Sequence, residues 1–214
     1  MSTIRIQAGY RVKVGNKTLD PSCPEDLEKI ATFLAAPNAV SGLAYNGQAA
    51  AVIKLVLALT PEGQGAVLAA PFVVQDLAYN GQAAAVIELL RAMKPEGQAT
   101  VLTAPYALWS LADNGQPAAV IELLQAMKPE EQATALAAPY AVWSLAADGQ
   151  AAAVIEVLKV MKPEGQAVVL AASHAVKGLT IKGQGAAVRA IQRSLAPKAP
   201  CAGRPRASLP VNSR

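Results

Sequence analysis

The sequence is poor in the residue types from which catalytic and metal sites are most often built. Its 214 residues include one histidine and two cysteines, and aromatic residues make up only 4% of the chain. Cys23 and Cys201 lie near opposite ends without metal-ligand spacing, which disfavours a disulfide framework and favours a reducing compartment. No Ser/Cys–His–acid set or phosphate-binding loop accompanies the single histidine, His174. We therefore expect a non-enzymatic protein with no catalytic residue, no metal and no cofactor.

Long hydrophobic segments are also missing. The first residues, MSTIRIQAGYRVKV, contain no apolar core behind a basic end and predict no secretory signal. The longest apolar helical stretch, residues 49–59, contains Lys54 and stops before Pro61, far short of the ~20 residues that cross a membrane. We expect a soluble protein without a membrane span. It would be cytoplasmic, or translocated into a host cell by a route without a classical signal peptide.

The chain is instead rich in alanine and in internal repetition. Hydrophobic residues make up 53% of it, and many are alanine, which has the highest helix propensity. Successive 34-residue units begin at Leu43, Leu77, Leu111, Leu145 and Leu179. The second and third units are identical at 27 of 34 positions, and such self-similarity is typical of solenoids. We predict an all-α, right-handed α-solenoid with two to three short helices in each unit.

Proline and glycine divide each unit into segments. In the second unit, QAAAVIELLRAM has apolar residues at helical spacing, and Pro95 then stands at a first helical position, followed by Glu96. At Pro105 the chain either kinks or begins a third helix. Gly115 ends that third segment and suits a left-handed C-cap. Each unit therefore holds two helices, one of them kinked, or three short helices, and the pattern favours three.

The segments outside the full units differ from them. A partial unit precedes Leu43, and alternating apolar residues within 4–14 predict a β-hairpin around QAG. We assign residues 1–22 to this hairpin cap and residues 23–196 to the helical array. Residues 197–214 form a basic, proline-rich tail that we expect to be disordered.

A few positions vary from unit to unit, and they share one face of the third segment. We count from the start of the third segment, which is Pro105 in the second unit. The residues one, four and eight places after this position vary between units, whereas those three and six places after it are always aliphatic. Spacings of three and four place the variable side chains on one helical face, away from the aliphatic stripe. Stacked units would align these faces into a continuous surface. The residues assigned to this partner-binding face are Phe72, Gln75, Tyr79, Tyr106, Trp109, Asp113, Tyr140, Trp143, His174 and Lys177.

Two interpretations of this face are open. Solvated surface positions also vary freely, and the two tryptophans could fill space between units. However, the tryptophan position also holds Ser41, Gln75 and Lys177, which is unusual for a core position. Trp and Tyr are also favoured anchors at protein interfaces. We therefore predict a protein- or peptide-binding scaffold, and by analogy with near-identical tandem units elsewhere, a bacterial effector-type protein that acts on host factors.

The residue pairs before the glycines lead to an alternative. The pairs are Tyr45-Asn46, Tyr79-Asn80, Asp113-Asn114, Ala147-Asp148 and Ile181-Lys182. Together with LTPEGQ at Leu59, they resemble the 34-residue repeats of TAL effectors, in which a variable pair before a glycine reads DNA bases. The resemblance implies nucleic-acid contacts by Asn46, Asn80, Asn114, Asp148 and Lys182. Tetratricopeptide repeats have the same period, but their aromatic and glycine signature is missing here.

The distribution of charge bears on whether the chain binds nucleic acid. Residues 43–178 carry a net charge of −4, whereas residues 179–214 carry +7 and no acidic residue. Affinity for DNA depends on neutralising phosphates, so the acidic units disfavour it and the basic C-terminal part favours it. This part equally suits a targeting segment or a solvated linker. The arginines that could contact nucleic acid are Arg189, Arg193, Arg204 and Arg206.

Overall fold

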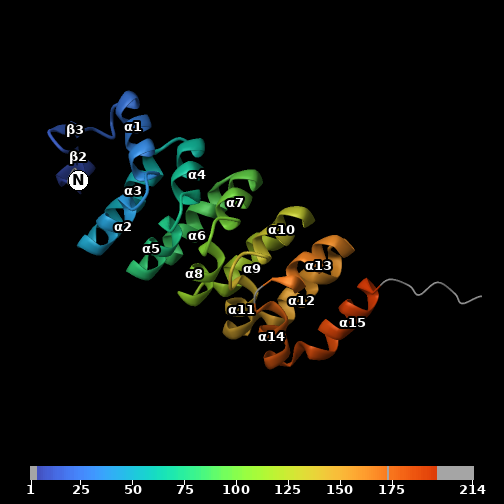
Figure 1. The fold of residues 1–214 in the computed structure, drawn as a ribbon. Coiled ribbons are helices and arrows are strands. Elements are labelled where there is room, and N and C mark those ends of the chain that lie inside the picture. Colours follow the sequence, from blue (N-terminus) through green and yellow to red (C-terminus); the bar gives the residue numbers. More distant parts are fainter. Residues whose placement is uncertain (1–3, 173, 197–214) are drawn as a thin grey trace, which may run out of the picture.

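The computed structural model describes residues 4–172 and 174–196. The disorder predicted for residues 197–214 therefore lies outside the described part of the chain. Within that part the protein is mostly helical, with one small sheet near the N-terminus (Figure 1). The helices follow one another along the molecule in chain order, and α1 and α15 lie at opposite ends of the series (Figure 1).

The N-terminal sheet has three antiparallel strands in the order β1-β2-β3. They are β1 (Ile4–Ile6), β2 (Val12–Val14) and β3 (Lys17–Leu19). The predicted hairpin is confirmed by the pairing of β1 with β2, and β3 is an addition that the alternation of apolar residues did not indicate. The backbone N–H of Ile6 donates to Gln48 Oε1 at 3.2 Å, and Gln48 Nε2 donates to the Ile6 carbonyl at 2.8 Å. This pair of bonds fastens the sheet to the helices.

Three kinds of helix alternate along the chain. The proline helices begin at a proline: α1 (Pro24–Leu34), α4 (Pro61–Ala69), α7 (Pro95–Leu102), α10 (Pro129–Leu136) and α13 (Pro163–Ala171). The short helices are α2 (Ala39–Leu43), α5 (Val73–Leu77), α8 (Ala107–Asp113), α11 (Ala141–Leu145) and α14 (Ala175–Leu179). The middle helices are α3 (Ala49–Ala58), α6 (Ala83–Ala92), α9 (Pro117–Ala126), α12 (Ala151–Val160) and α15 (Gly185–Leu195). Each helix contacts the next helix of its own kind, and in Figure 1 the middle helices lie between the other two rows.

The local signals of the sequence explain these boundaries. Pro95 occupies the first turn of α7, where its missing N–H is not needed, and a separate helix follows Pro105, as the proline pattern favours. Gly115 ends α8 with φ 82°, which confirms the left-handed C-cap. Its N–H donates to Ala112 at 3.1 Å, and the N–H of Gln116 donates to Leu111 at 3.0 Å, which together form a Schellman motif. The glycines after the other short helices, with φ from 74° to 87°, are Gly47, Gly81, Gly149 and Gly183.

In each proline helix from α4 onward, a glutamine side chain donates hydrogen bonds to carbonyls at the end of the preceding middle helix. Gln132 Nε2 donates to the carbonyls of Leu124 and Met127, at 2.9 and 3.1 Å. The last carbonyls of a helix have no partner within it, so this amide supplies bonds that the buried helix end requires. The equivalent glutamines, which the sequence analysis did not single out, are Gln64, Gln98 and Gln166.

The hydrophobic core is continuous from the sheet to the last helix. The aliphatic stripe of the short helices lies in it as predicted: Leu108, Leu111 and Leu145 are fully buried. In the last short helix Val176 is only partly buried.

Two segments are long and apolar enough to cross a membrane by length and composition, namely Ala39–Ala58 and Ala141–Val160. Each is interrupted by a left-handed glycine, Gly47 or Gly149, and about half of each apolar window is buried within the fold (44% and 56%). These properties also fit core helices and do not make the chain a membrane protein.

Candidate functional site

The residues assigned to the partner-binding face lie along the row of short helices. One residue immediately precedes each short helix, and it follows a proline in four cases and Ser173 in the last. These residues all have left-handed backbone conformations, with φ between 61° and 66°: Asn38, Phe72, Tyr106, Tyr140 and His174. A positive φ is uncommon outside glycine, is best tolerated by asparagine, and is an outlier for a bulky side chain. No local pattern around these residues indicates this conformation.

The side chains at these positions form a series of ring contacts, which we call the aromatic ladder. Phe72 and Tyr106 stack with their ring centroids 6.0 Å apart and their planes 18° apart. Tyr140 and His174 stack at 5.2 Å and 13°. Trp109 bridges the two stacks, since its ring lies 5.9 Å from Tyr106 and 6.5 Å from Tyr140. The ladder therefore runs without a break from Phe72 to His174.

Two further rings and one cation complete the aromatic ladder. Tyr79 meets Trp109 edge to face at 5.8 Å, and Trp143 meets His174 in the same way at 6.0 Å. The ammonium of Lys177 lies 5.8 Å from the ring centroid of Trp143, within range of a cation–π contact. The structure thus brings together most of the predicted face, including residues from four different units.

The rings of the aromatic ladder differ in their exposure to solvent, and the two tryptophans are less exposed than the phenylalanine and two of the tyrosines. Phe72, Tyr79 and Tyr140 are 45%, 47% and 42% exposed. Trp109 and Trp143 are only partly exposed. The interpretation that the tryptophans fill space between units is therefore correct for part of each indole. The exposed rings of the ladder are those of Phe72, Tyr79, Tyr140 and His174.

Each tryptophan packs beside a small residue of the following unit. The hydroxyl of Ser144, which is buried, lies 3.5 Å from the backbone carbonyl of Trp109. A Cβ atom on Gly178 would lie 3.1 Å from the Cα of Trp143 and 3.3 Å from its Cε3 atom. The indoles fit because the neighbouring position is serine or glycine.

Several polar side chains lie near the N-terminal end of the row of short helices. Ser41 donates a hydrogen bond to the carboxylate of Asp76, which is buried. Gln75 has a buried Oε1 atom without a hydrogen-bond partner among the described residues. Burial and the nearby carboxylate of Asp113 raise the pKa of Tyr79 above its usual value, so the phenol stays neutral at physiological pH.

The residues implied in nucleic-acid contact are placed differently. The amides of Asn46, Asn80 and Asn114 donate to backbone carbonyls four residues earlier, at 2.7, 2.8 and 2.8 Å. These amide groups therefore close the last turn of a short helix. Asp148 lies beside the Ser144 hydroxyl at 3.4 Å.

The basic residues near the C-terminus point to solvent where the structure describes them. Lys182, Arg189 and Arg193 are exposed. Arg193 donates through Nε to the carbonyl of Arg189 at 3.3 Å. Arg204 and Arg206 lie outside the described residues.

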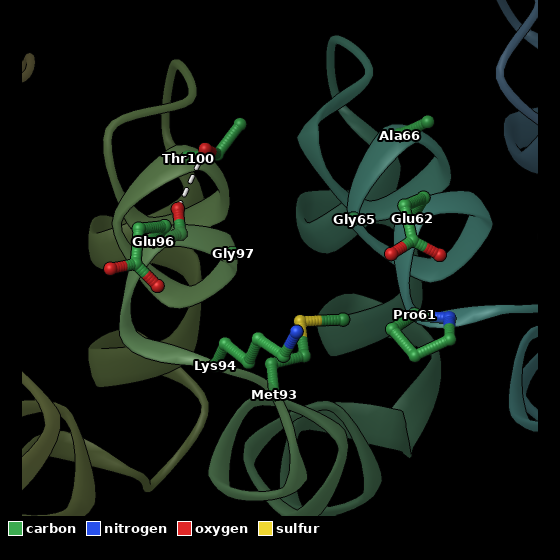
Figure 2. Close-up of a pocket in the computed structure, with 9 residues that line it drawn as sticks. All are labelled: Pro61, Glu62, Gly65, Ala66, Met93, Lys94, Glu96, Gly97 and Thr100. Carbon is green, nitrogen blue, oxygen red and sulfur yellow. Dashed lines mark hydrogen bonds between the residues drawn. The ribbon is translucent and has the colours of Figure 1, made fainter.

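The row of proline helices carries a second series of hollows, which the sequence analysis did not anticipate. A groove of about 340 Å³ lies between α4 and α7, and Figure 2 shows the residues that line it. Glu62 and Glu96 stand on its two walls, and Lys94 and Met93 lie at its base (Figure 2). The Thr100 hydroxyl donates a hydrogen bond to the Glu96 carbonyl of the same helix at 2.8 Å. Related hollows lie beside α1, α10 and α13.

Some of the charges along the proline helices form ion pairs between neighbouring helices. Lys162 donates to Glu130 at 2.8 Å, and Lys128 lies 4.0 Å from Glu96. The hydrogen bond from Lys162 lowers the pKa of Glu130, and the same bond raises the pKa of Lys162. These side chains are largely exposed, and ion pairs of this kind contribute little to stability.

Comparison with known proteins adds no assignment. Within residues 4–172 and 174–196, no three His, Cys, Asp or Glu side chains form a group that could hold a metal ion. No protein-family model, curated protein or solved structure matches the chain significantly.

Proposed function

We propose that this chain is an α-solenoid scaffold, not an enzyme, and that it binds a protein or peptide along the aromatic ladder. The solenoid is supported by the contacts of each helix with the next of its kind. It is also supported by the starts of the middle helices at residues 49, 83, 117, 151 and 185, which are 34 residues apart. In such a fold, equivalent side chains of successive units form one extended surface.

The observation that carries this proposal is the presence of bulky rings in left-handed conformations. That conformation is unfavourable by roughly 1–2 kcal/mol for an ordinary residue and is easier for asparagine. The chain has asparagine there once, at Asn38, but it places Phe72, Tyr106 and Tyr140 at the next three positions. Backbone strain of this kind is concentrated at functional sites, where stability is given up for a role. Rings that remain exposed in such positions are suited to contact a partner.

The chemistry of the ladder favours a polypeptide partner. Its surface is made of aromatic rings with few charges, and tyrosine and tryptophan dominate the strong contacts of protein interfaces. Asp113 is exposed beside Tyr79, and units within residues 43–178 carry a net charge of −4. A phosphate backbone lying along the whole ladder would meet this negative charge.

The test is a selection from a random-peptide phage library with the full chain as bait. The matched control is the Tyr106→Asn/Tyr140→Asn variant, which keeps a residue that suits the left-handed conformation and removes two rings. We expect the wild type to enrich peptides that the variant does not hold, while both give the same helical circular dichroism. Equal capture by the variant, or no enrichment by the wild type, contradicts the proposal.

Nucleic-acid binding by the C-terminal part is the second candidate. It is supported by the exposure of Lys182, Arg189 and Arg193, none of which forms an ion pair among the described residues. Fluorescence anisotropy of a random DNA duplex at two salt concentrations tests it, with the full chain and a version that ends at Ala196. Steeply salt-dependent binding by both proteins would favour this candidate over the peptide scaffold. Binding lost with the tail would confine DNA contact to the tail arginines.

A further inference from the structure

The aromatic ladder ends in a small apolar pocket between α11 and α14. Its volume is about 260 Å³, and it is lined by Trp143, Ala147, Gly178, Ile181 and Lys182. The pocket depends on the glycine, since a Cβ atom on Gly178 would lie against the Trp143 ring. Ile181 forms part of its rim and is 61% exposed. An apolar side chain of a partner could lie here between an isoleucine and an indole.

The rim of this pocket is positively charged. Lys182 lines the pocket, and the Lys177 ammonium lies over the Trp143 ring at 5.8 Å. Neither lysine forms an ion pair within the part of the chain that the structure describes. The positions equivalent to Lys182 in the two preceding units are Asn114 and Asp148. Unpaired cations therefore belong to this end of the ladder and not to its earlier units.

We propose that this pocket holds an apolar side chain of an acidic peptide, whose flanking carboxylates pair with Lys177 and Lys182. The inference rests on the proposed peptide-binding function and names the chemistry of the partner at one end of the same surface. The apolar lining supplies the contact area, and the two lysines select the charge of the residues beside the anchor. Complementary charge of this kind sets specificity and the rate of association more than total affinity.

A peptide fits these observations better than a nucleic acid. Among the described residues that line the pocket, only the Lys182 ammonium and the Trp143 indole carry polar side-chain groups, and both are donors without an acceptor, so the lining does not resemble the paired donors and acceptors that read a base edge. Farther along the ladder, Asp148 and Asp113 are exposed and would repel the next phosphates. A short acidic segment can end at the two lysines, whereas a polyanion that continued along the ladder would meet these carboxylates.

The experiment uses the full chain labelled with 5-fluorotryptophan, which gives one ¹⁹F signal for each of its two tryptophans. A Trp109→Phe variant assigns the signals. The first probe is a peptide with a central Phe-Leu pair between Glu and Asp residues. The second has lysines in place of the acids, and the third has serines in place of Phe-Leu. We expect the first peptide to shift the Trp143 signal, and the other two to bind at least about tenfold more weakly.

Two variants test the parts of the pocket separately. The Lys177→Glu/Lys182→Glu variant changes exposed side chains only, and we expect about a tenfold or greater loss of affinity for the acidic peptide. The Gly178→Ser variant fills the pocket with a residue that the chain itself uses at Ser110 and Ser144, so the fold can accept it at this position. We expect it to weaken binding of the acidic peptide without changing helicity.

The outcomes separate this inference from the proposed function. If peptides shift only the Trp109 signal, or if the charge-reversed variant binds the acidic peptide as well as the wild type, the inference is wrong and the ladder remains a peptide-binding surface. If library-selected peptides also leave both signals unchanged, the proposed function fails with it. If a single-stranded oligonucleotide shifts the Trp143 signal at a lower concentration than the acidic peptide does, the inference is wrong and a nucleic acid becomes the candidate ligand of the pocket.

Discussion

The row of short helices and the row of proline helices repeat equally often but use their side chains in opposite ways. Along the proline helices, the recurring polar groups bond within the protein: Gln132 to two carbonyls and Glu130 to Lys162. Along the short helices, Phe72 and Tyr140 are held in an unfavourable backbone conformation and still leave almost half of their surface exposed. The polar side chains of the proline helices hold the units together. The row of short helices keeps aromatic surface exposed to solvent.

The comparison also explains which positions vary between units. The glutamine of the proline helices is the same residue at Gln64, Gln98, Gln132 and Gln166, because each bonds to a helix end of fixed geometry. The residue immediately before each short helix ranges from asparagine to phenylalanine, tyrosine and histidine, although all share one backbone conformation. Constant positions serve contacts inside the protein. The varying positions share a conformation but not a chemistry, which is expected where the chemistry serves a partner.

The largest effect is expected on the proline row. Gln132→Ala removes the only donor to the Met127 carbonyl among the described residues and leaves the Leu124 carbonyl with the Met127 N–H alone, and we expect it to lower the free energy of unfolding by about 2 kcal/mol. Urea denaturation followed by circular dichroism measures this change. Gln150→Ala is the control, because Gln150 is half-buried and has no side-chain hydrogen bond among the described residues. Equal losses in the two variants would remove the distinction between the rows.

A smaller effect is expected on the short-helix row. Tyr106→Asn suits the left-handed conformation but loses ring contacts, so we expect unfolding free energy within about 1 kcal/mol of the wild type. Tyr106→Val loses the same contacts and places a β-branched residue there, so it should be less stable than Tyr106→Asn by roughly 1–2 kcal/mol. The same urea measurement compares the pair. If valine and asparagine are equally tolerated, the strain argued for this row is absent.

A local electrostatic effect should also be visible on the short-helix row. Burial and the Asp113 carboxylate raise the pKa of Tyr79, so Asp113→Asn should bring it closer to the usual value. Because this pKa is raised in the folded protein, its contribution to stability is present below the ordinary tyrosine pKa and is lost as the pH rises through the raised pKa. A ¹³Cζ NMR titration of the tyrosines measures the shift. Asp148→Asn should leave Tyr79 unchanged, and a matching response there would contradict the pairing.

The smallest effect belongs to the exposed ion pairs of the proline row. Lys162→Met removes the bond that lowers the pKa of Glu130, which should therefore rise toward its usual value. Since the folded-state pKa is lowered, the contribution of this pair is present above the ordinary glutamate pKa and disappears as the pH falls through the lowered pKa. Carboxyl ¹³C NMR follows this titration. Lys159→Met, whose partner is Glu156, is the control that should leave Glu130 unaffected.

Much of the fold could be predicted because its signals are local. Pro95 and Pro105 mark helix starts through the geometry of proline itself, and Gly115 marks a helix end because glycine accepts a positive φ. The β1–β2 pairing followed from the alternation of apolar residues. The assembly of the ladder residues on one face followed from spacings of three and four along a helix.

Other features depend on contacts between segments that no local pattern encodes. The bonds from Gln98 to the carbonyls of the preceding helix exist only once the two helices meet at an angle. Nothing in the letters around Tyr106 indicates a positive φ, because the tertiary fold imposes it against the preference of the residue. The partial burial of Trp143 similarly depends on Gly178, a residue of the next unit.

The bonds between Gln48 and Ile6 carry a consequence for how such a protein can change over generations. The sheet bonds through the Ile6 backbone to a side chain that recurs as Gln82, Gln116, Gln150 and Gln184, and the segment after β1 also bonds through Tyr10 to Lys54, which only the first unit has in place of a glutamate or a neutral residue. Recombination between the nearly identical copies could add or delete one of them without rebuilding either terminus. Each event would lengthen or shorten the row of rings by one step and so alter the length of the proposed binding surface. The length of the aromatic ladder can thus change between generations in steps of one 34-residue unit.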